Sequence, residues 1–399
     1  MKNKAIVLNE DQIKAVQKII KWYYIESYQK NYFALGGLAG TGKSFLVSYI
    51  INKLDIQPHE VIFACFTGKA ALRLRITGNN ANTIHSTFYR VLQKGDGTVS
   101  FYRRKNLSDI YKLIVIDEAG MVGMDMMNDI LAFNVPTILL GDPGQLKPIL
   151  RKENQYMKEE NLDVFLTIPM RFSDTSGILD LATLAREGKG IPYGSYKKSD
   201  VVHYRDIRNK LHTFDQVICF KHRTRKKLNV KIRKQLGYDN HIYPVKGEKI
   251  ICLKNNYNHN LTYNGLSIYL INGLIGIMLE DSIIDKQTGL LRVKFRPDFI
   301  DDKDIYFDLL CHPEYFSTHY YDVELPDMFP PKSQKKANDE STAFLTYAYT
   351  IGLHKYQGSE ADNVCCIIDD FPPSHPDYKR FIYTGITRAK ERITVATFK

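Results

Sequence analysis

The sequence lacks any long apolar run. Although 44% of its 399 residues are hydrophobic, no stretch approaches the roughly 18 consecutive apolar residues of a membrane span. The opening residues, Met-Lys-Asn-Lys-Ala-Ile-Val-Leu, lead into charged sequence and contain no signal-peptide core. We therefore expect a soluble, cytoplasmic protein of about two to four domains, with no membrane partner.

Paired cysteines are missing too. No C-x-x-C pair and no histidine at ligand spacing accompany the six cysteines, which are Cys65, Cys219, Cys252, Cys311, Cys365 and Cys366. This pattern excludes a zinc site of the usual spacing and a disulfide framework. We expect buried thiols, with the neighbours Cys365 and Cys366 on opposite faces of a strand.

Acidic residues are fewer than basic ones. The 44 Asp and Glu against 55 Lys and Arg leave a formal net charge of +11, which favours a polyanionic partner such as a phosphodiester backbone. The densest basic segment, residues 221–234, places Leu228 and Ile232 at helical spacing. A solvated amphipathic helix and a nucleic-acid-binding face both remain open there.

The strongest motif is a complete G-x-x-x-x-G-K-[ST] phosphate-binding loop. Its glycines let backbone N–H groups wrap around phosphate oxygens, Lys43 can reach the β- and γ-phosphates, and the Ser44 hydroxyl can bind Mg²⁺. A short strand over 32–35 and a helix over 45–50 are predicted on either side. The predicted nucleotide-binding residues in this loop are Gly37, Gly40, Thr41, Gly42, Lys43 and Ser44.

A second motif points to hydrolysis. The apolar run over 112–116 ends in Asp117 and Glu118, the pattern of a strand buried on both faces of a parallel sheet. At the carboxyl end of that strand, Asp117 would hold Mg²⁺ and Glu118 would polarise the water that attacks the γ-phosphate.

Three further strand ends carry polar residues. Thr67 and Lys69 follow the run 61–66, where a helix N-terminus could hold a phosphate, and His85 lies in the next polar cluster. Gln145 follows the run 137–140 and could sense the γ-phosphate.

In this order, the motifs resemble those of superfamily 1B helicases, the RecD-like and phage Dda-like branch. The resemblance covers nearly the whole chain. The matching segments are 8–12 (Q motif), 37–44 (I), 67–71 (Ia), 83–85 (Ib), 117–119 (II), 141–148 (III), 169–171 (IV), 349–360 (V) and 383–390 (VI).

The resemblance implies residue roles that composition and spacing do not give. It adds Arg171 and Arg388 to the catalytic set, with Arg388 as an arginine finger, and Gln12 and Glu360 to the nucleotide site. It also implies that Thr350, His354 and Lys355, together with Thr67, Lys69 and His85, contact a bound single strand of DNA.

The implied fold is α/β, with two RecA-like P-loop NTPase domains and two insertions. The expected boundaries are 1–86 and 113–175 for domain 1A, 87–112 for a pin hairpin (1B), 176–245 and 344–399 for domain 2A, and 246–343 for an SH3-like β-barrel with an extended arm (2B). Alternating runs around a Gly-Asp-Gly turn support the hairpin, with Phe101 or Tyr102 as the wedge that meets a duplex; a hairpin without that role is the alternative. Short strands with turn residues between them support the barrel.

Together these features predict an ATP-dependent, Mg²⁺-using 5′→3′ helicase of a bacterial or phage-infected cell, acting as a monomer on single-stranded and forked DNA. Replication or recombination proteins are candidate partners. The alternative is a DNA-stimulated ATPase that displaces bound proteins without processive unwinding. A pure binding module is disfavoured because Lys43, Asp117, Glu118 and Arg388 are all present.

Overall fold

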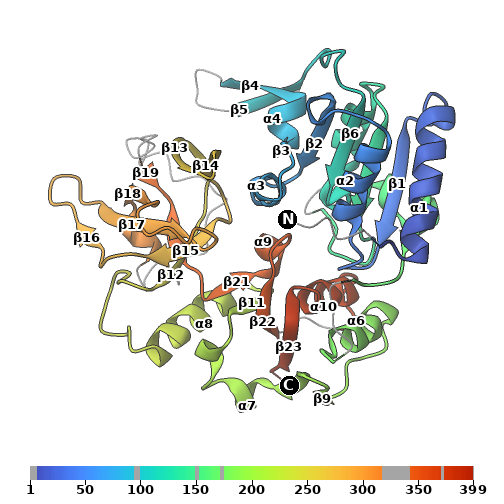
Figure 1. Cartoon of the computed structure of the whole chain (residues 1–399). Coiled ribbons are helices and arrows are strands. Elements are labelled where there is room, and N and C mark those ends of the chain that lie inside the picture. The colour runs from blue at the N-terminus through green and yellow to red at the C-terminus, as the bar shows by residue number, and fades with distance from the viewer. Residues whose placement is uncertain are drawn as a thin grey trace. The chain divides into compact units, whose positions relative to one another are not determined.

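The computed structural model describes residues 7–93, 99–148, 152–170, 175–316, 342–369 and 373–398 (Figure 1). Internal contacts divide the chain into two compact units. The first unit holds Met1–Asp174, Ala185–Gly188 and Lys379–Thr387, and the second holds Thr175–Leu184, Lys189–Tyr378 and Arg388–Lys399.

The first unit is built on a six-stranded parallel sheet. Its strand order is β3 (Ala81–Thr83), β2 (Val61–Cys65), β6 (Leu113–Asp117), β7 (Thr137–Gly141), β1 (Tyr32–Gly37) and β8 (Val164–Leu166). All neighbouring strands run parallel. Their carboxyl ends therefore share one edge, where ligands bind in open α/β sheets.

Helices and short 3₁₀ turns connect these strands. The helices are α1 (Glu10–Lys21), α2 (Lys43–Lys53), α3 (Gly68–Ile76), α4 (Ile84–Phe88) and α5 (Met124–Leu131), with a π-helical turn η1 (Trp22–Glu26). The 3₁₀ turns of this unit are η2 (Pro58–Glu60), η3 (Ala119–Met121), η4 (Gln155–Met157) and η5 (Glu159–Asn161).

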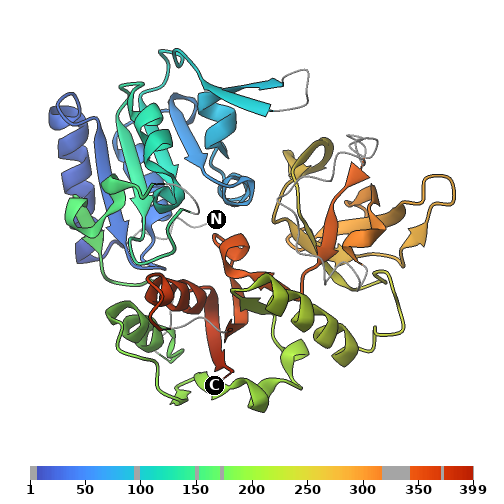
Figure 2. The same ribbon diagram turned by 180° about the vertical axis from the view of Figure 1, so that it is seen from behind.

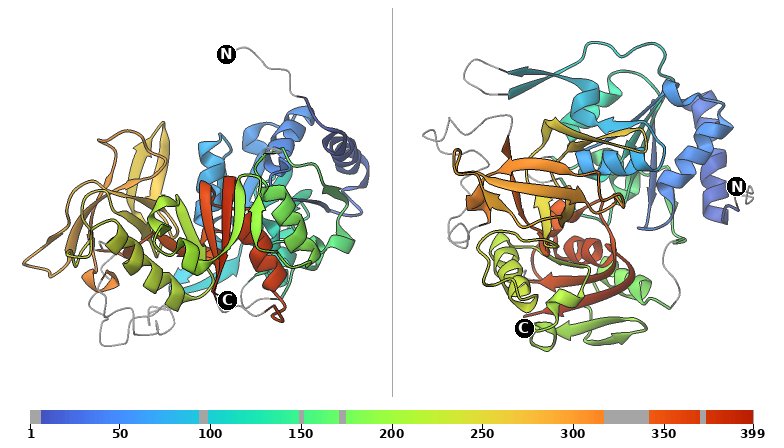
Figure 3. Two further views of the ribbon diagram at one scale, coloured as in Figure 1. Left: turned by 90° about the horizontal axis from the view of Figure 1, so that it is seen from below. Right: turned by 60° about the vertical axis from the view of Figure 1, so that its left-hand side comes forward.

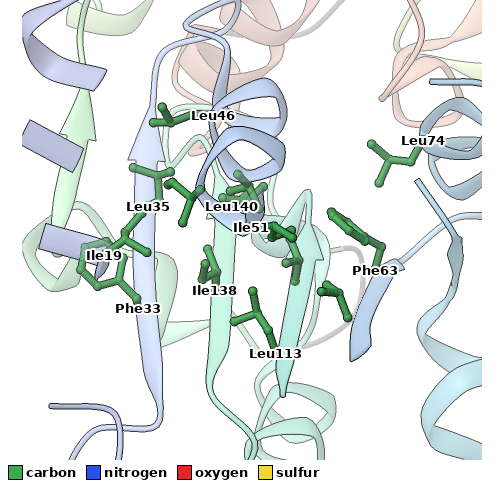
Figure 4. Close-up of a cluster of buried hydrophobic side chains, with 14 of the residues drawn as sticks. Ile19, Phe33, Leu35, Leu46, Ile51, Phe63, Leu74, Leu113, Ile138 and Leu140 are labelled. Carbon is green, nitrogen blue, oxygen red and sulfur yellow. The ribbon is translucent and has the colours of Figure 1, made fainter. Parts of the chain in front are cut away.

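Both faces of the sheet are buried, as the unbroken apolar runs predict. Phe33 and Leu35 of β1 point into one hydrophobic cluster, which includes Ile19 of α1 and Leu46 of α2 (Figure 4). Ala34, between them, belongs to a second cluster with residues of α4 and α5. Alternation along the strand thus fixes the sheet between two helical layers.

A two-stranded hairpin, β4 (Tyr89–Gln93) and β5 (Val99–Arg103), extends from the first unit after α4 (Figure 2). The predicted Gly-Asp-Gly turn lies in residues 94–98, outside the described residues. The register pairs Val91 with Phe101 and Arg90 with Tyr102, so these two aromatic side chains lie on opposite faces of the hairpin.

The second unit contains another mostly parallel sheet. Its order is β21 (Thr350–Gly352), β11 (Gln216–Cys219), β22 (Ala361–Ile368), β23 (Ala389–Thr397), β10 (Ser199–His203) and β9 (Gly194–Tyr196), and β9 alone among them runs antiparallel. Helices α7 (Tyr204–Ile207), α8 (His222–Gln235) and α9 (Leu353–Tyr356) and the turn η6 (Leu211–Thr213) accompany it. Helices α6 (Ile178–Glu187) and α10 (Tyr378–Ile386) each have residues in both units.

Helix α8 confirms the helix predicted over the basic segment. Leu228 and Ile232 are buried in a cluster with residues of β11 and β22, and α8 packs on β21 (Figure 3). Arg233 of the same helix forms a buried bidentate ion pair with Glu248, with Nε to Oε1 at 2.8 Å and Nη2 to Oε2 at 3.1 Å.

A third, largely antiparallel sheet follows, in the order β19 (Thr342–Ala343), β18 (Phe307–Cys311), β17 (Leu291–Pro297), β15 (Ile275–Met278), β12 (Lys249–Cys252) and β20 (Leu345–Tyr347), with β16 (Ile283–Ile284) beside β17. A separate ribbon pairs β13 (Asn256–Tyr263) with β14 (Leu266–Leu270), and the turn η7 (Pro313–Tyr315) follows β18. The Asn264-Gly265 turn between β13 and β14 has φ of 49° and 75°, which explains the choice of these two residues.

Two expectations for this region need correction. Residues 297–340 were expected to form the extended arm, but Phe307–Cys311 within them is strand β18, because alternate apolar side chains fill the inner face of the sheet. Strand β20 pairs with β12, so this sheet continues past the expected boundary at residue 343. The later part of the expected arm, 317–340, lies outside the described residues.

Each of the six cysteines is a buried thiol, as predicted. No helix in the described part of the chain combines the length and the apolar character that a membrane span requires.

Candidate functional site

The phosphate-binding loop connects β1 to α2, as the sequence predicts. Gly40 and Gly42 have φ of 78° and 80°, a left-handed conformation that side chains with a Cβ rarely adopt. Gly37 is needed for a different reason: a Cβ there would lie 2.9 Å from Thr41 Oγ1 and from Leu166 Cβ. Backbone conformation therefore requires glycine at positions 40 and 42, and close packing requires it at position 37.

Two polar side chains reach this loop. The Lys43 ammonium donates to the carbonyl oxygens of Gly37 and Leu38 at 2.8 and 3.0 Å. Gln12, which is buried, donates from Nε2 to the Thr41 carbonyl at 3.1 Å, while its Oε1 accepts from the N–H of Asn9 at 3.2 Å. Gln12 thus ties the N-terminus of α1 to the loop, and its predicted contact with adenine stays a prediction.

The two acids lie where β6 ends beside the loop. The Ser44 hydroxyl donates to Asp117 Oδ2 at 3.1 Å, so the two predicted Mg²⁺ ligands are adjacent. Glu118 has φ of 52°, an unusual left-handed conformation for a residue with a side chain, and its N–H donates to Asp117 Oδ1 at 2.9 Å. Such backbone strain is concentrated at functional sites, where the surrounding structure holds it in place.

Gln145 follows β7, which lies between β1 and β6 in the sheet. This order places the Gln145 loop at the sheet edge shared by the phosphate-binding loop and the acids. The cavity beside it, of about 350 Å³, is lined by Asp142, Gln145, Lys147, Glu153, Lys158 and Arg380, among other residues. None of its lining residues belongs to the phosphate-binding loop, so it is not the phosphate site itself.

Two segments of the first unit that are predicted to bind a DNA strand lie at the starts of helices, at the same edge of the sheet. Thr67 caps α3, accepting from the N–H of Ala70 at 3.2 Å, and Lys69 lies in the first turn of that helix. His85 lies in α4, with its ring centroid 4.8 Å from that of Phe101 and 6.1 Å from that of Phe66.

The aromatic pair of the hairpin divides by face. Phe101 lies on the face that contacts His85, whereas Tyr102 lies on the other face with Leu92. Phe101 is 49% exposed and Tyr102 is 50% exposed. Exposure does not distinguish them, but their neighbours do.

In the second unit, Thr350, His354 and Lys355 lie on β21 and α9. The backbone of Thr350 is held by Asn229 of α8 through two hydrogen bonds of 2.9 and 3.0 Å, and its Oγ1 is buried with no hydrogen-bond partner among the described residues. Burial lowers the pKa of His354, and burial, with Arg225 nearby, lowers the pKa of Lys355 to about 8.

The ends of motifs V and VI meet within the second unit. Arg388 is buried, and its Nη1 lies 3.5 Å from the carbonyl oxygen of Ser359, the residue before Glu360. Arg388 and Glu360 belong to a different unit from the phosphate-binding loop, so their roles towards ATP stay predictions. Arg171 lies in residues 171–174, outside the described residues.

Sequence reasoning missed three residues around the Gln145 loop. The buried Asp142 and Tyr383 and the partly exposed Arg186 form a network, with Asp142 Oδ1 3.1 Å from Arg186 Nη1 and Asp142 Oδ2 2.6 Å from Tyr383 Oη. Asp142 and Tyr383 lie inside recognised motifs, but they are 241 positions apart in the chain, and no local sequence pattern predicts a contact over that distance. Arg186 carries no motif signal at all.

Comparison with known proteins gives matches over both parts of the chain. The family model described as AAA domain matches residues 7–206, and that of the UvrD-like helicase C-terminal domain matches residues 347–396. The ATP-dependent DNA helicase dda of Enterobacteria phage T4 is 26% identical over 239 residues, which cover 52% of this chain and 53% of that protein. The matched region thus spans about half the length of this relative.

Solved structures of Pif1 helicases share the fold. The chain is 18% identical to a structure described as the basis for DNA unwinding at forked dsDNA by two coordinating Pif1 helicases, with a TM-score of 0.57 and coverage of 98% of this chain and 92% of that one. Pif1 of Candida albicans is 16% identical, with a TM-score of 0.53 and coverage of 98% and 94%. Bacteroides Pif1 bound to single-stranded DNA is also 16% identical, with a TM-score of 0.53 and coverage of 98% and 92%.

These matches agree with the order of the motifs and with the two parallel sheets. The chain is similar to Dda and to Pif1 helicases, and because the AAA domain model matches half of it, the chain belongs to the AAA domain family.

Proposed function

We propose that this protein is an ATP-dependent translocase and helicase that moves 5′→3′ along single-stranded DNA and unwinds duplex DNA. One observation carries the proposal. A single sheet edge in the first unit bears the hydrolytic residues Lys43, Asp117 and Glu118, and also the capped starts of α3 and α4, whose amides suit a phosphate backbone. ATP and a DNA strand would therefore contact neighbouring loops of one rigid sheet.

The hydrolytic step follows from the positions of these side chains. Lys43 would leave the carbonyls of Gly37 and Leu38 for the β- and γ-phosphates, and Glu118 would orient and deprotonate the attacking water. Ser44 and Asp117, only 3.1 Å apart, fit Mg²⁺, which binds proteins through one or two ligands and supplies charge neutralisation at the phosphates. Gln145 would sense the γ-phosphate, and Arg171 and Arg388 would neutralise charge on the transferred group.

The domain roles follow the family arrangement. Residues 1–86 and 113–175 would form domain 1A, 87–112 the pin, 176–245 and 344–399 domain 2A, and 246–343, extended to β20, an SH3-like 2B domain. A parallel sheet, a mostly parallel sheet and a separate, largely antiparallel sheet support this division.

A translocating strand would contact both RecA-like domains. We assign Thr67, Lys69 and His85 of the first, and Thr350, His354 and Lys355 of the second, to its backbone and bases. The net charge of +11 favours such a polyanion. The 5′→3′ polarity rests on the family alone.

The pin would separate the strands of a forked duplex. Tyr102 and Leu92, on the face opposite His85, offer exposed apolar surface to replace the lost base stacking. Phe101 would instead brace the pin against His85.

Replication or recombination proteins would be the partners of this protein. It would work as a monomer in the cytoplasm of a bacterial or phage-infected cell.

Unwinding of a duplex with a 5′ tail, compared with a 3′ tail, tests the proposal. Unwinding of the 5′-tailed substrate alone, in the presence of ATP and Mg²⁺, is the expected result, and Lys43→Ala should abolish it. Displacement of a bound protein without unwinding of either substrate would replace the helicase by a protein-displacing ATPase. No ATP hydrolysis with any nucleic acid would overturn the proposal as a whole.

A further inference from the structure

Helix α10 holds the Gln145 loop through three side chains, all within the first unit. Arg380 donates to the carbonyl oxygens of Pro143 and Gln145, the latter at 3.1 Å. Thr384 Oγ1 accepts from the N–H of Leu146 at 3.1 Å. The backbone of the loop is therefore fixed by residues that lie about 240 positions away in the chain.

The third side chain, Tyr383, also reaches the phosphate-binding loop. Its hydroxyl donates to Asp142 Oδ2 at 2.6 Å and accepts from the N–H of Ala39 at 3.2 Å. A phenol has one proton to donate and lone pairs to accept, so both bonds form at once. Burial, and then the neighbouring Asp142 carboxylate, raise the pKa of Tyr383 well above its usual range, so the hydroxyl remains a donor.

Asp142 is the centre of this network. Its side chain is fully buried, and Oδ1 accepts from the N–H of Gly144 at 2.9 Å and from Arg186 Nη1 at 3.1 Å. The Arg186 guanidinium also lies 5.8 Å from the centre of the Tyr383 ring. The buried carboxylate thus has a charged partner and several donors, as a buried charge requires.

The space around the network is filled. A Cβ on Gly144 would lie 2.9 Å from Arg186 Nη1 and 3.2 Å both from Asp142 Oδ1 and from the Tyr383 ring. Gly144 directly precedes Gln145. Any shift of the Tyr383 hydroxyl or of Asp142 is therefore passed to the backbone that carries Gln145.

We propose that Tyr383 is a positioning residue, which couples the phosphate-binding loop to the Gln145 loop through its hydroxyl. Amides of this loop type face bound phosphates, so a γ-phosphate and the Tyr383 hydroxyl compete for the N–H of Ala39. When ATP occupies the phosphate-binding loop, the Tyr383 hydroxyl loses the N–H of Ala39, and its hydrogen bond to Asp142, which holds the backbone before Gln145, changes with it. This inference deepens the proposed function and rests on ATP hydrolysis.

The test compares Tyr383→Phe with Asp142→Asn and with the double variant, in steady-state ATP hydrolysis at saturating single-stranded DNA. Phenylalanine keeps the ring against Arg186 and removes only the hydroxyl. We expect kcat to fall about tenfold in each single variant, the loss that one buried charge-assisted hydrogen bond accounts for. The KM for ATP should not rise, because the hydroxyl competes with the γ-phosphate rather than binding it.

Two readouts separate positioning from mere stability. The double variant should be no slower than Asp142→Asn alone, because the Tyr383 hydroxyl acts through its bond to Asp142. The matched control is Tyr347→Phe, which removes another buried hydroxyl, bonded to the Ile242 carbonyl at 3.3 Å in the second unit, and should leave kcat and KM unchanged.

An unchanged kcat in Tyr383→Phe, additive losses in the double variant, or a raised KM with a lowered melting temperature would each overturn the positioning role. In all three cases an active wild type would leave the proposed function standing. A wild type without DNA-stimulated hydrolysis would instead remove the proposed function, and this inference with it.

Discussion

Lys355 provides a pH test of the proposed DNA-binding surface. Burial disfavours its charged form, and the like charge of Arg225 adds to the effect, so its pKa falls from an ordinary value of 10.5 to about 8. A DNA phosphate at this position would favour the charged form. The complex would then hold a proton that the free protein loses as the pH rises through about 8.

The size of the effect follows from that pKa. About 10% of free Lys355 is neutral at pH 7 and about 90% at pH 9. If the complex stays protonated, affinity for single-stranded DNA should fall about tenfold between these two values. The neighbours do not titrate in this range: burial lowers the pKa of His354, and burial raises the pKa of Cys252 to about 12.

Fluorescence anisotropy with a labelled oligonucleotide, at fixed ionic strength and at both pH values, measures this change. Lys355→Arg is the matched control, since a guanidinium stays charged throughout and its affinity should be flat with pH. Lys355→Met should bind weakly at both pH values. If wild type and Lys355→Arg show the same pH dependence, Lys355 does not hold a phosphate in the complex.

Three further outcomes are expected. Glu118→Gln should bind ATP but lose strand-stimulated hydrolysis, because the amide cannot activate water; wild-type turnover in a phosphate-release assay would refute the assignment. Tyr102→Ala should impair fork unwinding, while DNA-stimulated ATPase activity and translocation along single strands persist. Phe101→Ala removes the contact with His85 of motif Ib and should reduce all three activities. Identical behaviour of the two variants would contradict the assignment of the two side chains to opposite faces of the hairpin. Glu248→Gln leaves the buried Arg233 guanidinium without its charged partner and should lower the free energy of unfolding of the second unit by about 3 kcal/mol. Glu280→Gln, which removes the exposed partner of Lys294, should lower it by less than about 1 kcal/mol. Equal losses in denaturant titrations would show that burial does not matter for these ion pairs.

Local patterns predicted most of the fold around the phosphate-binding loop. Unbroken apolar runs predicted strands buried on both faces, and β1, β2, β6 and β7 lie where those runs stand. Spacing of Leu228 and Ile232 predicted α8 with its buried side, and turn residues between short strands predicted the β-rich region, where Asn264 and Gly265 form the turn between β13 and β14. Each of these signals is short-range, because helix and strand periods and turn conformations are set by adjacent residues.

The sequence was least informative where pairing is long-range. Strand β18 was assigned to an arm because Asp, Pro and Lys surround it, yet its pairing with β17 places Phe307 and Leu309 in the core. Strand β20 joins β12 across almost a hundred residues. Nothing in a single strand states which partner will satisfy its backbone.

By itself, the sequence determined the chemistry: a phosphate-binding loop, two acids after a buried strand, and the ordered motifs that identify the family. Tertiary structure alone decided how this chemistry is held. It placed β7 between β1 and β6, put Phe101 against His85, and joined Ala39, Asp142 and Tyr383 in one hydrogen-bonded network. The reason is physical: a motif fixes residue types at short spacing. The two hydrogen bonds of Tyr383 instead join it to residues that lie 241 and 344 positions away in the chain, and such bonds exist only once the chain has folded.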